Sequence, residues 1–330
     1  MRVTKALATF YGVLFGAAAL GAATAPAAVA AEDVFPSKPL QIVVPYGPGG
    51  VVDVLSRIVV DRMAAALGQA VVVQNRPGGN ANIGPSLVAQ AQPDGYTLLA
   101  SSSATVINPY IEKNPGFGHD SFVPIARIAQ SPNLIVVPAS LEVATLADFV
   151  TLAKARPGLA TPVTGPGSSQ AVARALFAKS ADIELLDVAY KGGVNFITDL
   201  LAGTLAMSVS PVNVVGRLVH EGKLVALANT AEQRSPIVPE VPTLTEAGYP
   251  EATSVSWFGL HAPAGTPASA LDKIASAVKA ATGDPEVVEK IKALGAEIAY
   301  LDKPAFEEFI ASERSRAEKY AAEIKVAAQQ

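Results

Sequence analysis

Four short runs of small residues stand out as places where this chain could bind a ligand. They occupy residues 46–50, 101–105, 164–169 and 190–193, and each lies between an expected strand and an expected helix. The first N–H groups of a helix have no partner within the helix, and that end carries a partial positive charge. Glycine lacks a Cβ, so a ligand can approach its backbone closely. The runs therefore predict that main-chain groups bind an anion, either a carboxylate or a phosphate.

The same runs do not carry the fingerprints of nucleotide binding. A dinucleotide fingerprint that starts at Gly47 requires a glycine where this chain has Val52. A phosphate-binding loop ends in Gly-Lys-Ser or Gly-Lys-Thr, but Gly222-Lys223 is followed by Leu224. Neither motif supports a nucleotide ligand.

Individual residues in and beside the runs are the candidate ligand contacts. Asp53 is expected to support its loop by accepting from free N–H groups, and Lys191 fits either a ligand contact or an ordinary surface position. Tyr46, Tyr190 and the pair at 257–258 could wall a cleft. The hydroxyls of Ser101, Thr105, Ser168 and Ser169 are expected to donate to the ligand. The complete set is Tyr46, Pro48, Gly49, Gly50, Asp53, Ser101, Ser102, Thr105, Thr164, Ser168, Ser169, Tyr190, Lys191 and Gly192.

Catalytic motifs have little support in this sequence. The histidines His119, His220 and His261 are far apart and show no metal-ligand spacing, so no metal site is expected. The Gly-x-Ser-x-Gly turn of α/β hydrolases is absent. We expect no catalytic residues and no cofactor. A dispersed Ser/His/Asp triad is not excluded by the sequence. A periplasmic α/β hydrolase is therefore the alternative to a ligand-binding protein.

Composition narrows the class of protein. The chain has 330 residues, no cysteine and a formal net charge of −4. The acidic balance argues against a nucleic-acid partner, since phosphate binding requires a basic face. The absence of cysteine excludes disulfides and thiolate metal sites. A chain of this length has room for one large domain or two ordinary ones.

The N-terminus has the organisation of a secretory signal peptide. Arg2 and Lys5 precede an uncharged stretch over residues 6–31, which ends in small residues. Its strongly apolar part is too short to span a bilayer. We expect cleavage after Ala30, which lowers the net charge to −6. Because no cysteine follows, a lipid anchor is excluded, and the predicted location is the periplasm.

Strands and helices alternate from residue 38 onward. The buried runs 40–44, 71–73 and 96–100 indicate parallel strands separated by helices, and the rhythm starts again at 134–137. This pattern predicts an α/β fold of two blocks, with a doubly wound sheet in each.

Three expected helices near the C-terminus should pack back on the first block. This predicts one discontinuous lobe, formed by residues 31–130 plus 256–330, and a second lobe of residues 131–255. The two chain crossings between these lobes would form a hinge, and the hinged cleft is the expected ligand site.

Several short motifs give the sequence a family resemblance. They include Asn75-Arg76-Pro77-Gly78, Pro93-Asp94-Gly95-Tyr96-Thr97, Tyr190-Lys191-Gly192 and Trp257-Phe258-Gly259-Leu260. In this order, and with the stretch 36–53, they resemble the Bug family, the periplasmic solute-binding receptors of tripartite tricarboxylate transporters. The resemblance covers nearly all of the chain after residue 30.

The resemblance implies a two-lobed type II periplasmic-binding fold that captures a small organic carboxylate. It implies delivery to a membrane transporter with one large and one small subunit, and it places the ligand at the four runs. Such receptors are usually monomers. A signalling partner instead of a transporter is a further alternative. Departures from the family pattern at Ala171, Ala189 and 207–213 lie in the second lobe and leave the identity of the ligand open.

Overall fold

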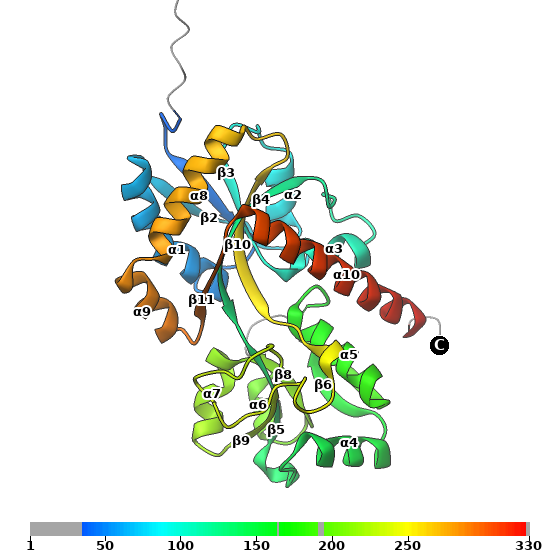
Figure 1. Cartoon of the computed structure of the whole chain (residues 1–330). Coiled ribbons are helices and arrows are strands. Elements are labelled where there is room, and N and C mark those ends of the chain that lie inside the picture. The colour runs from blue at the N-terminus through cyan, green and yellow to red at the C-terminus, as the bar shows by residue number, and fades with distance from the viewer. Residues whose placement is uncertain (1–34, 164, 191–194, 328–330) are drawn as a thin grey trace, which may run out of the picture. The chain divides into compact units, whose positions relative to one another are not determined.

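The computed structural model describes residues 35–163, 165–190 and 195–327. The chain forms two units, residues 1–34 and residues 35–330, and every described residue lies in the second. The expected signal peptide therefore falls outside the described residues. Within the second unit, helices and strands alternate along the chain as an α/β fold (Figure 1).

A six-stranded mixed sheet is the framework of the first lobe. Its strands are β1 (Leu40–Val44), β2 (Val71–Asn75), β3 (Thr97–Ser101), β4 (Phe122–Ser131), β10 (Ser256–Pro263) and β11 (Glu297–Leu301). The order across the sheet is β11-β4-β10-β3-β1-β2. β1 pairs in parallel with β2 and β3, whereas β10 and β11 run antiparallel to their neighbours.

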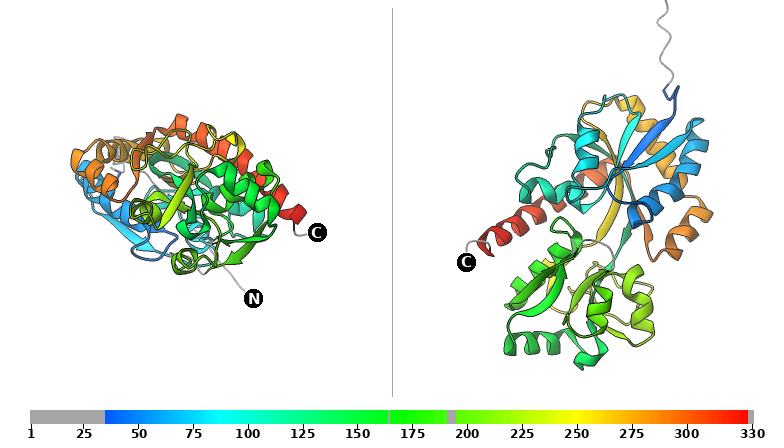
Figure 2. Two further views of the ribbon diagram at one scale, coloured as in Figure 1. Left: turned by 90° about the horizontal axis from the view of Figure 1, so that it is seen from below. Right: turned by 180° about the vertical axis from the view of Figure 1, so that it is seen from behind.

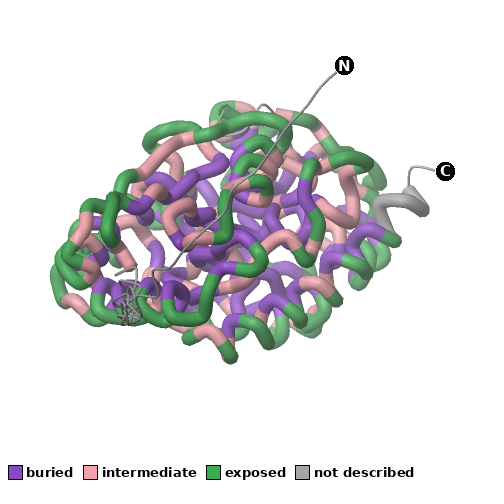
Figure 3. The backbone as a smooth tube through the Cα atoms, turned by 90° about the horizontal axis from the view of Figure 1, so that it is seen from above, coloured by how far each residue is buried: buried purple, intermediate pink, exposed green. Residues whose placement is uncertain are grey.

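Helices cover both faces of this sheet. Successive strand residues point to opposite faces, so neighbouring residues of one strand pack on different helices. Ile42 of β1 packs in one cluster with α1 (Val51–Leu67) and α8 (Ala268–Thr282). Its neighbour Val43 packs instead with α2 (Ile83–Ala89). Strand residues of the first lobe are thus buried on both sides. Figure 3 shows the buried segments inside this unit and the exposed segments around them.

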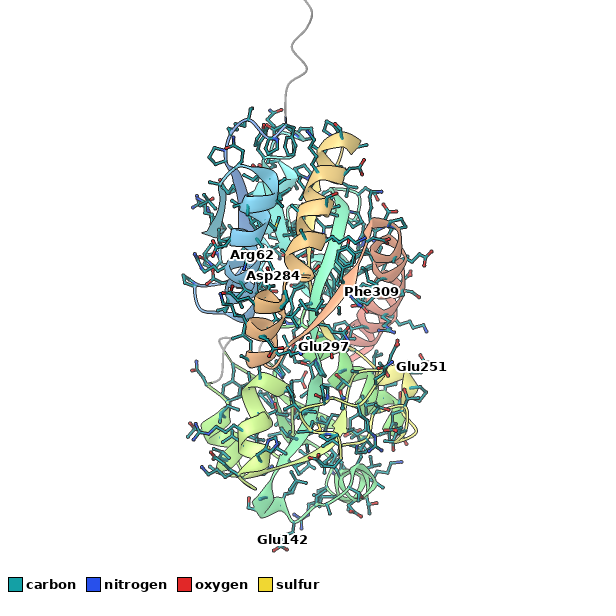
Figure 4. The ribbon with its side chains drawn as sticks, turned by 60° about the vertical axis from the view of Figure 1, so that its left-hand side comes forward. Arg62, Glu142, Glu251, Asp284, Glu297 and Phe309 are labelled. Atoms are coloured by element: carbon teal, nitrogen blue, oxygen red, sulfur yellow. The ribbon has the colours of Figure 1, made fainter. Side chains whose placement is uncertain are left out.

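Ion pairs join α1 to the start of α9 (Pro285–Ala293). Arg62 lies 2.9 Å from Asp284 and 3.0 Å from Glu286 (Figure 4). Because these side chains are partly exposed, water screens the pairs and their contribution to stability is small. They align two helices that pack on the same sheet face.

The C-terminal helix α10 (Lys303–Ala327) reaches both lobes. It packs on α3 (Ser103–Ile111) and β4, as expected, and then continues to α5 (Ser169–Ala181) of the second lobe (Figure 2). The Tyr320 hydroxyl donates to the carbonyl of Pro166 across 3.0 Å. A helix of 25 residues is roughly 37 Å long, which carries it past the sheet. The helix thus packs on the first lobe and also contacts the second.

The second lobe contains two smaller sheets. β5 (Asn133–Pro138) runs antiparallel between β8 (Ser208–Pro211) and β9 (Leu224–Asn229), and β6 (Leu159–Val163) pairs in parallel with β7 (Leu185–Ala189). A hydrogen bond of 2.9 Å from Ala206 N to Ala160 O links the sheets. The remaining elements are α4 (Leu146–Ala155), α5, α6 (Ile197–Leu201), α7 (Val212–His220), and the 3₁₀ turns Ala139–Leu141 and Pro250–Ala252.

The chain passes between the lobes at two places. β4 ends at Ser131 and β5 begins at Asn133, while β10 leaves the second lobe at Ser256. The fully buried Asn133 lies at the first crossing and forms hydrogen bonds to the second. Its Nδ2 donates to Ser254 O (3.4 Å), and its Oδ1 accepts from Ser256 Oγ (3.2 Å). A polar cluster therefore joins the two connecting segments.

Some elements differ from the expected ones. The sequence pattern did not indicate β4, β6, β8, α7 or β11. β6 and β8 contain Pro162 and Pro211, and proline is rare in strands because it cannot donate to the ladder. Tertiary pairing outweighs this local preference.

Candidate functional site

A large cavity among the described residues lies where α1, α3 and α5 begin. Its volume is about 710 Å³, within the range of small-molecule sites. Residues from the starts of α1, α3 and α5 line it, together with residues from the beginning of β10. The free N–H groups of three helix N-termini therefore converge on one space, which suits a negatively charged group.

The loop before α1 is held by a buried carboxylate. Asp53 is 2% exposed and accepts from Gly49 N (2.9 Å), Arg57 Nε (3.0 Å) and Asn75 Nδ2 (2.9 Å). Burial alone would raise the pKa of Asp53, but these hydrogen bonds outweigh it and hold the pKa below its usual value. Gly49 has φ +80°, a conformation that other residues rarely adopt. Asp53 and Gly49 shape the loop without lining the cavity, whose wall here includes Gly47 and Gly50.

A hydrogen bond couples this loop to the start of α3. The Tyr46 and Ser102 hydroxyls lie 2.8 Å apart, and both residues line the cavity. Burial raises the pKa of Tyr46 above its usual value, although the Ser102 bond lowers it, so the phenol stays neutral. The side chain of Tyr46 can therefore form a wall of the site and fix the Ser102 hydroxyl.

Two of the expected hydroxyl donors lie outside the cavity wall. Ser101 is fully buried, and its Oγ lies 2.7 Å from His261 Nδ1. Thr105 accepts from Ser102 N at 3.4 Å and faces a second, smaller cavity. The reason is the strand-to-helix geometry, which turns these two side chains away from the side on which Ser102 lies. Both side chains instead form hydrogen bonds within the protein.

The second-lobe run contributes Ser168 and Ser169. Ser168 Oγ caps α5 by accepting from Ala171 N (3.2 Å), and it donates to Gly165 O (2.7 Å). Ser169 Oγ lies 2.9 Å from Ser256 Oγ. Both serines line the cavity. The N-terminal end of α5 at the cavity is thus tied to the polar cluster around Asn133.

The described part of the last expected run, Tyr190, does not contact the cavity. The Tyr190 hydroxyl donates to Asp199 at 2.6 Å, its ring packs on Phe196, and it does not line the cavity. Pro48 is likewise absent from the cavity wall. Thr164, Lys191 and Gly192 lie outside the described residues.

Sequence reasoning missed several lining residues. Gln170 follows Ser169, and its Nε2 donates to Asn133 Oδ1 (3.0 Å) and Ser256 Oγ (3.2 Å). Asn80 and Ala81 have positive φ and line the wall beyond Gly78. The glycine pair before Asn80 was the available signal, because such pairs mark irregular backbone. Ser131, Pro211 and Asn213 also line the cavity, and only the fold reveals them.

The cavity has no charged wall among the described residues. Apart from hydroxyl and amide groups, its lining is largely apolar and includes Val51, Val52, Trp257 and Phe258. Arg57 is committed to Asp53 and Asn75. Helix N-termini are therefore the main source of positive potential that the described residues offer to an anion.

The histidines are poorly placed for hydrolysis. None of the three lines the large cavity. His261 and Ser101 form a buried pair, but burial, aided by Arg314, lowers the His261 pKa to about 3, which makes it a weak base. Among the described residues, no group of three or more His, Asp or Glu could hold a metal. In the same part of the chain, no helix is long and apolar enough to cross a membrane.

Comparison with known proteins decides the family. Residues 55–326 match the family described as "Tripartite tricarboxylate transporter family receptor". The chain belongs to this receptor family. Its members in the comparison include a Pseudomonas sp. (strain P51) protein of the tcbD-tcbE intergenic region, which is 36% identical over 90% of each chain. Protein BugT of Bordetella pertussis is 32% identical over 96% of each chain.

Solved structures show that this receptor has the two-lobed type II periplasmic-binding fold. R. palustris Rpa4515 with adipate has a TM-score of 0.77 and 31% identity, covering 88% of this chain and 98% of its own. Periplasmic binding protein BugD has a TM-score of 0.74 and 28% identity, covering 89% of this chain and 99% of its own. MatC from Rhodopseudomonas palustris with bound malate has a TM-score of 0.75 and 27% identity, with coverages of 87% and 100%. These relatives are binding proteins, and the receptor is not an enzyme.

Proposed function

We propose that this receptor captures a small organic carboxylate in the 710 Å³ cavity. The observation that carries the proposal is the convergence of the α1, α3 and α5 N-termini on a space whose described lining has no charged side chain. A carboxylate can accept from free helix N–H groups, and the dipoles there favour its charge.

Two regions of the cavity lining would contact different parts of the proposed ligand. A carboxylate would lie near Gly50, Ser102 and Ser103, where first-lobe N–H groups and the Tyr46-bound hydroxyl are available. The rest of the molecule would contact the apolar part of the lining, to which Val51 and Phe258 contribute. The second lobe would then add contacts from the start of α5.

Closure of the second lobe on the first would retain the ligand. The crossings at 131–133 and 254–256 would act as the hinge between a lobe of residues 31–130 plus 256–330 and a lobe of residues 131–255. A ligand favours the closed form only through contacts that it gains on closure. Contacts from Ser168 and Ser169 would supply that difference.

The wider role follows from the family. We propose that the protein works as a monomer in the periplasm after removal of its signal peptide, and that it passes the ligand to a two-subunit membrane transporter. The adipate and malate complexes of its relatives support a carboxylate ligand.

A thermal-shift screen tests the proposal. Di-, tri- and aromatic carboxylates are added to the protein without its first 30 residues. A binding acid raises the melting temperature in proportion to the logarithm of its concentration above the Kd. If no acid raises the melting temperature, while a neutral sugar or an amino acid amide does, carboxylate capture is excluded.

A further inference from the structure

A second, smaller cavity lies on the far side of the first turn of α3. Its volume is about 180 Å³, and it is bounded by α3, β10, α10 and the segment 118–124. The polar groups that face it are Thr105, His119, His261, Glu307 and Arg314. None of these residues lines the large cavity.

Arg314 is the permanent positive charge of this second cavity. Its Nη2 donates to the carbonyl of His119 at 2.6 Å, whereas its Nε is buried and has no hydrogen-bond partner. Among the side chains that the structure describes, no carboxylate forms an ion pair with Arg314. Arg314 is half-buried and lines the cavity, so its positive charge is available to an anion there.

The two imidazoles beside Arg314 are neutral. Burial lowers the pKa of His261 to about 3, and Arg314 adds to the shift. Burial and Arg314 also lower the pKa of His119, against a smaller opposite effect of Asp120. Neutral imidazoles do not repel an anion and can donate an N–H to it.

The acidic groups nearby do not neutralise Arg314. Glu307 is exposed at the cavity edge and lies 2.6 Å from Lys303, so its charge is already balanced. Asp120 and Glu318 are exposed to solvent. The balance of charge inside the cavity is therefore positive.

We infer that the second cavity binds a small oxyanion, of the phosphate or sulfate type. A volume of 180 Å³ equals about six water molecules at ~30 Å³ each, enough for a tetrahedral oxyanion and part of its hydration. Arg314 supplies the positive charge of the cavity wall, and Thr105 and the histidines complete its polar groups.

This site is also connected to the candidate ligand cavity. His261 Nδ1 lies 2.7 Å from Ser101 Oγ, and Ser101 directly precedes Ser102, which lines the large cavity. An anion beside His261 would therefore fix the imidazole that supports the 101–105 loop. The oxyanion site stands independently of carboxylate capture, since it shares no lining residue with it.

Imidazole NMR with inorganic phosphate tests the inference. The protein has three histidines, of which His119 and His261 line the second cavity, whereas His220 lies on α7 of the second lobe. At constant ionic strength, phosphate should shift the ring resonances of His119 and His261 saturably and leave those of His220 unchanged. Equal shifts of all three, or none, would overturn the oxyanion site.

Two variants locate the binding. Arg314→Gln should weaken the phosphate-dependent shifts about tenfold or more, because it removes a charge-assisted donor. Lys319→Gln removes one positive charge from an exposed position of the same helix and should change them less than about twofold. If Arg314→Gln still binds phosphate with the wild-type affinity, the anion lies elsewhere, for example at the helix N-termini of the large cavity.

Discussion

Gly167 of the second lobe packs directly on Asn108 of α3 in the first. A Cβ at position 167 would overlap Asn108 Oδ1, and the asparagine cannot move freely, because its Nδ2 donates to Asn80 O (2.8 Å) and Asn82 Oδ1 (2.6 Å). Glycine at this position therefore permits the two lobes to meet at the proposed ligand site, whose wall includes Gly167.

Gly167→Ala should weaken ligand binding roughly tenfold, because an overlap of this kind costs about 1–3 kcal/mol in the arrangement in which Gly167 meets Asn108. The matched control is Gly165→Ala, where an added Cβ has nothing within 4 Å. Calorimetric titration of the best acid from the thermal-shift screen measures both. Equal losses in the two variants would mean that the methyl groups touch the ligand and that lobe contact is irrelevant.

Asp53→Asn should lower the stability by about 1–3 kcal/mol, since it disrupts the hydrogen bonds that hold the loop before α1. The control is Asp61→Asn on the exposed face of the same helix. Urea unfolding measures the free energy of unfolding. The folded pKa of Asp53 is lowered, so its contribution is complete above the unfolded pKa of about 4 and is lost as the pH falls further. A difference from wild type that persists unchanged at pH 3 would contradict this assignment.

His261 should make the protein less stable in mild acid. Its folded pKa is about 3, whereas the unfolded value is about 6.5, so only the unfolded chain takes up a proton between these values. The free energy of unfolding should fall by up to about 1.4 kcal/mol per pH unit below pH 6.5 from this group. His261→Gln should flatten the profile, while the control His220→Gln should not. Parallel profiles for wild type and His261→Gln would show that His261 is not buried as a neutral imidazole.

Trp257 should report ligand binding through its surroundings. It is the single tryptophan of the chain, it belongs to the wall of the large cavity, and its Nε1 donates to the buried Glu313 at 2.9 Å. Its ring is fully buried, so a ligand that changes the packing around the ring should change the fluorescence emission with the affinity that calorimetry gives. Free N-acetyltryptophanamide corrects for absorption by the ligand. Unchanged emission at saturation would place the ligand away from Trp257.

The first-lobe loops could be predicted from sequence because their signals are local. Glycines between a buried strand and a helix start, as in 46–50, mark a turn whatever the rest of the chain does. The expected support role of Asp53 depends on the same turn. Seven of the residues that the sequence singled out line one cavity: Tyr46, Gly50, Ser102, Ser168, Ser169, Trp257 and Phe258.

The side-chain partners could not be predicted because they depend on pairing across long sequence separations. Ser101 turns away from the cavity towards His261, which reaches it only because β10 pairs antiparallel with β3. Gln170 lines the cavity, and its amide is held there by a hydrogen bond to Asn133, which lies 37 residues earlier in the chain. Neither relation leaves a trace in local spacing.

The central claim is that the cavity recognises a carboxylate by its negative charge and acceptor oxygens. Calorimetric titration of one acid and of its primary amide tests this most directly, because the two ligands match in shape and differ in the group that the helix N-termini should bind. The account predicts saturable 1:1 binding of the acid and at least about a hundredfold weaker binding of the amide, equivalent to ~2.8 kcal/mol. Equal affinities for acid and amide would contradict it.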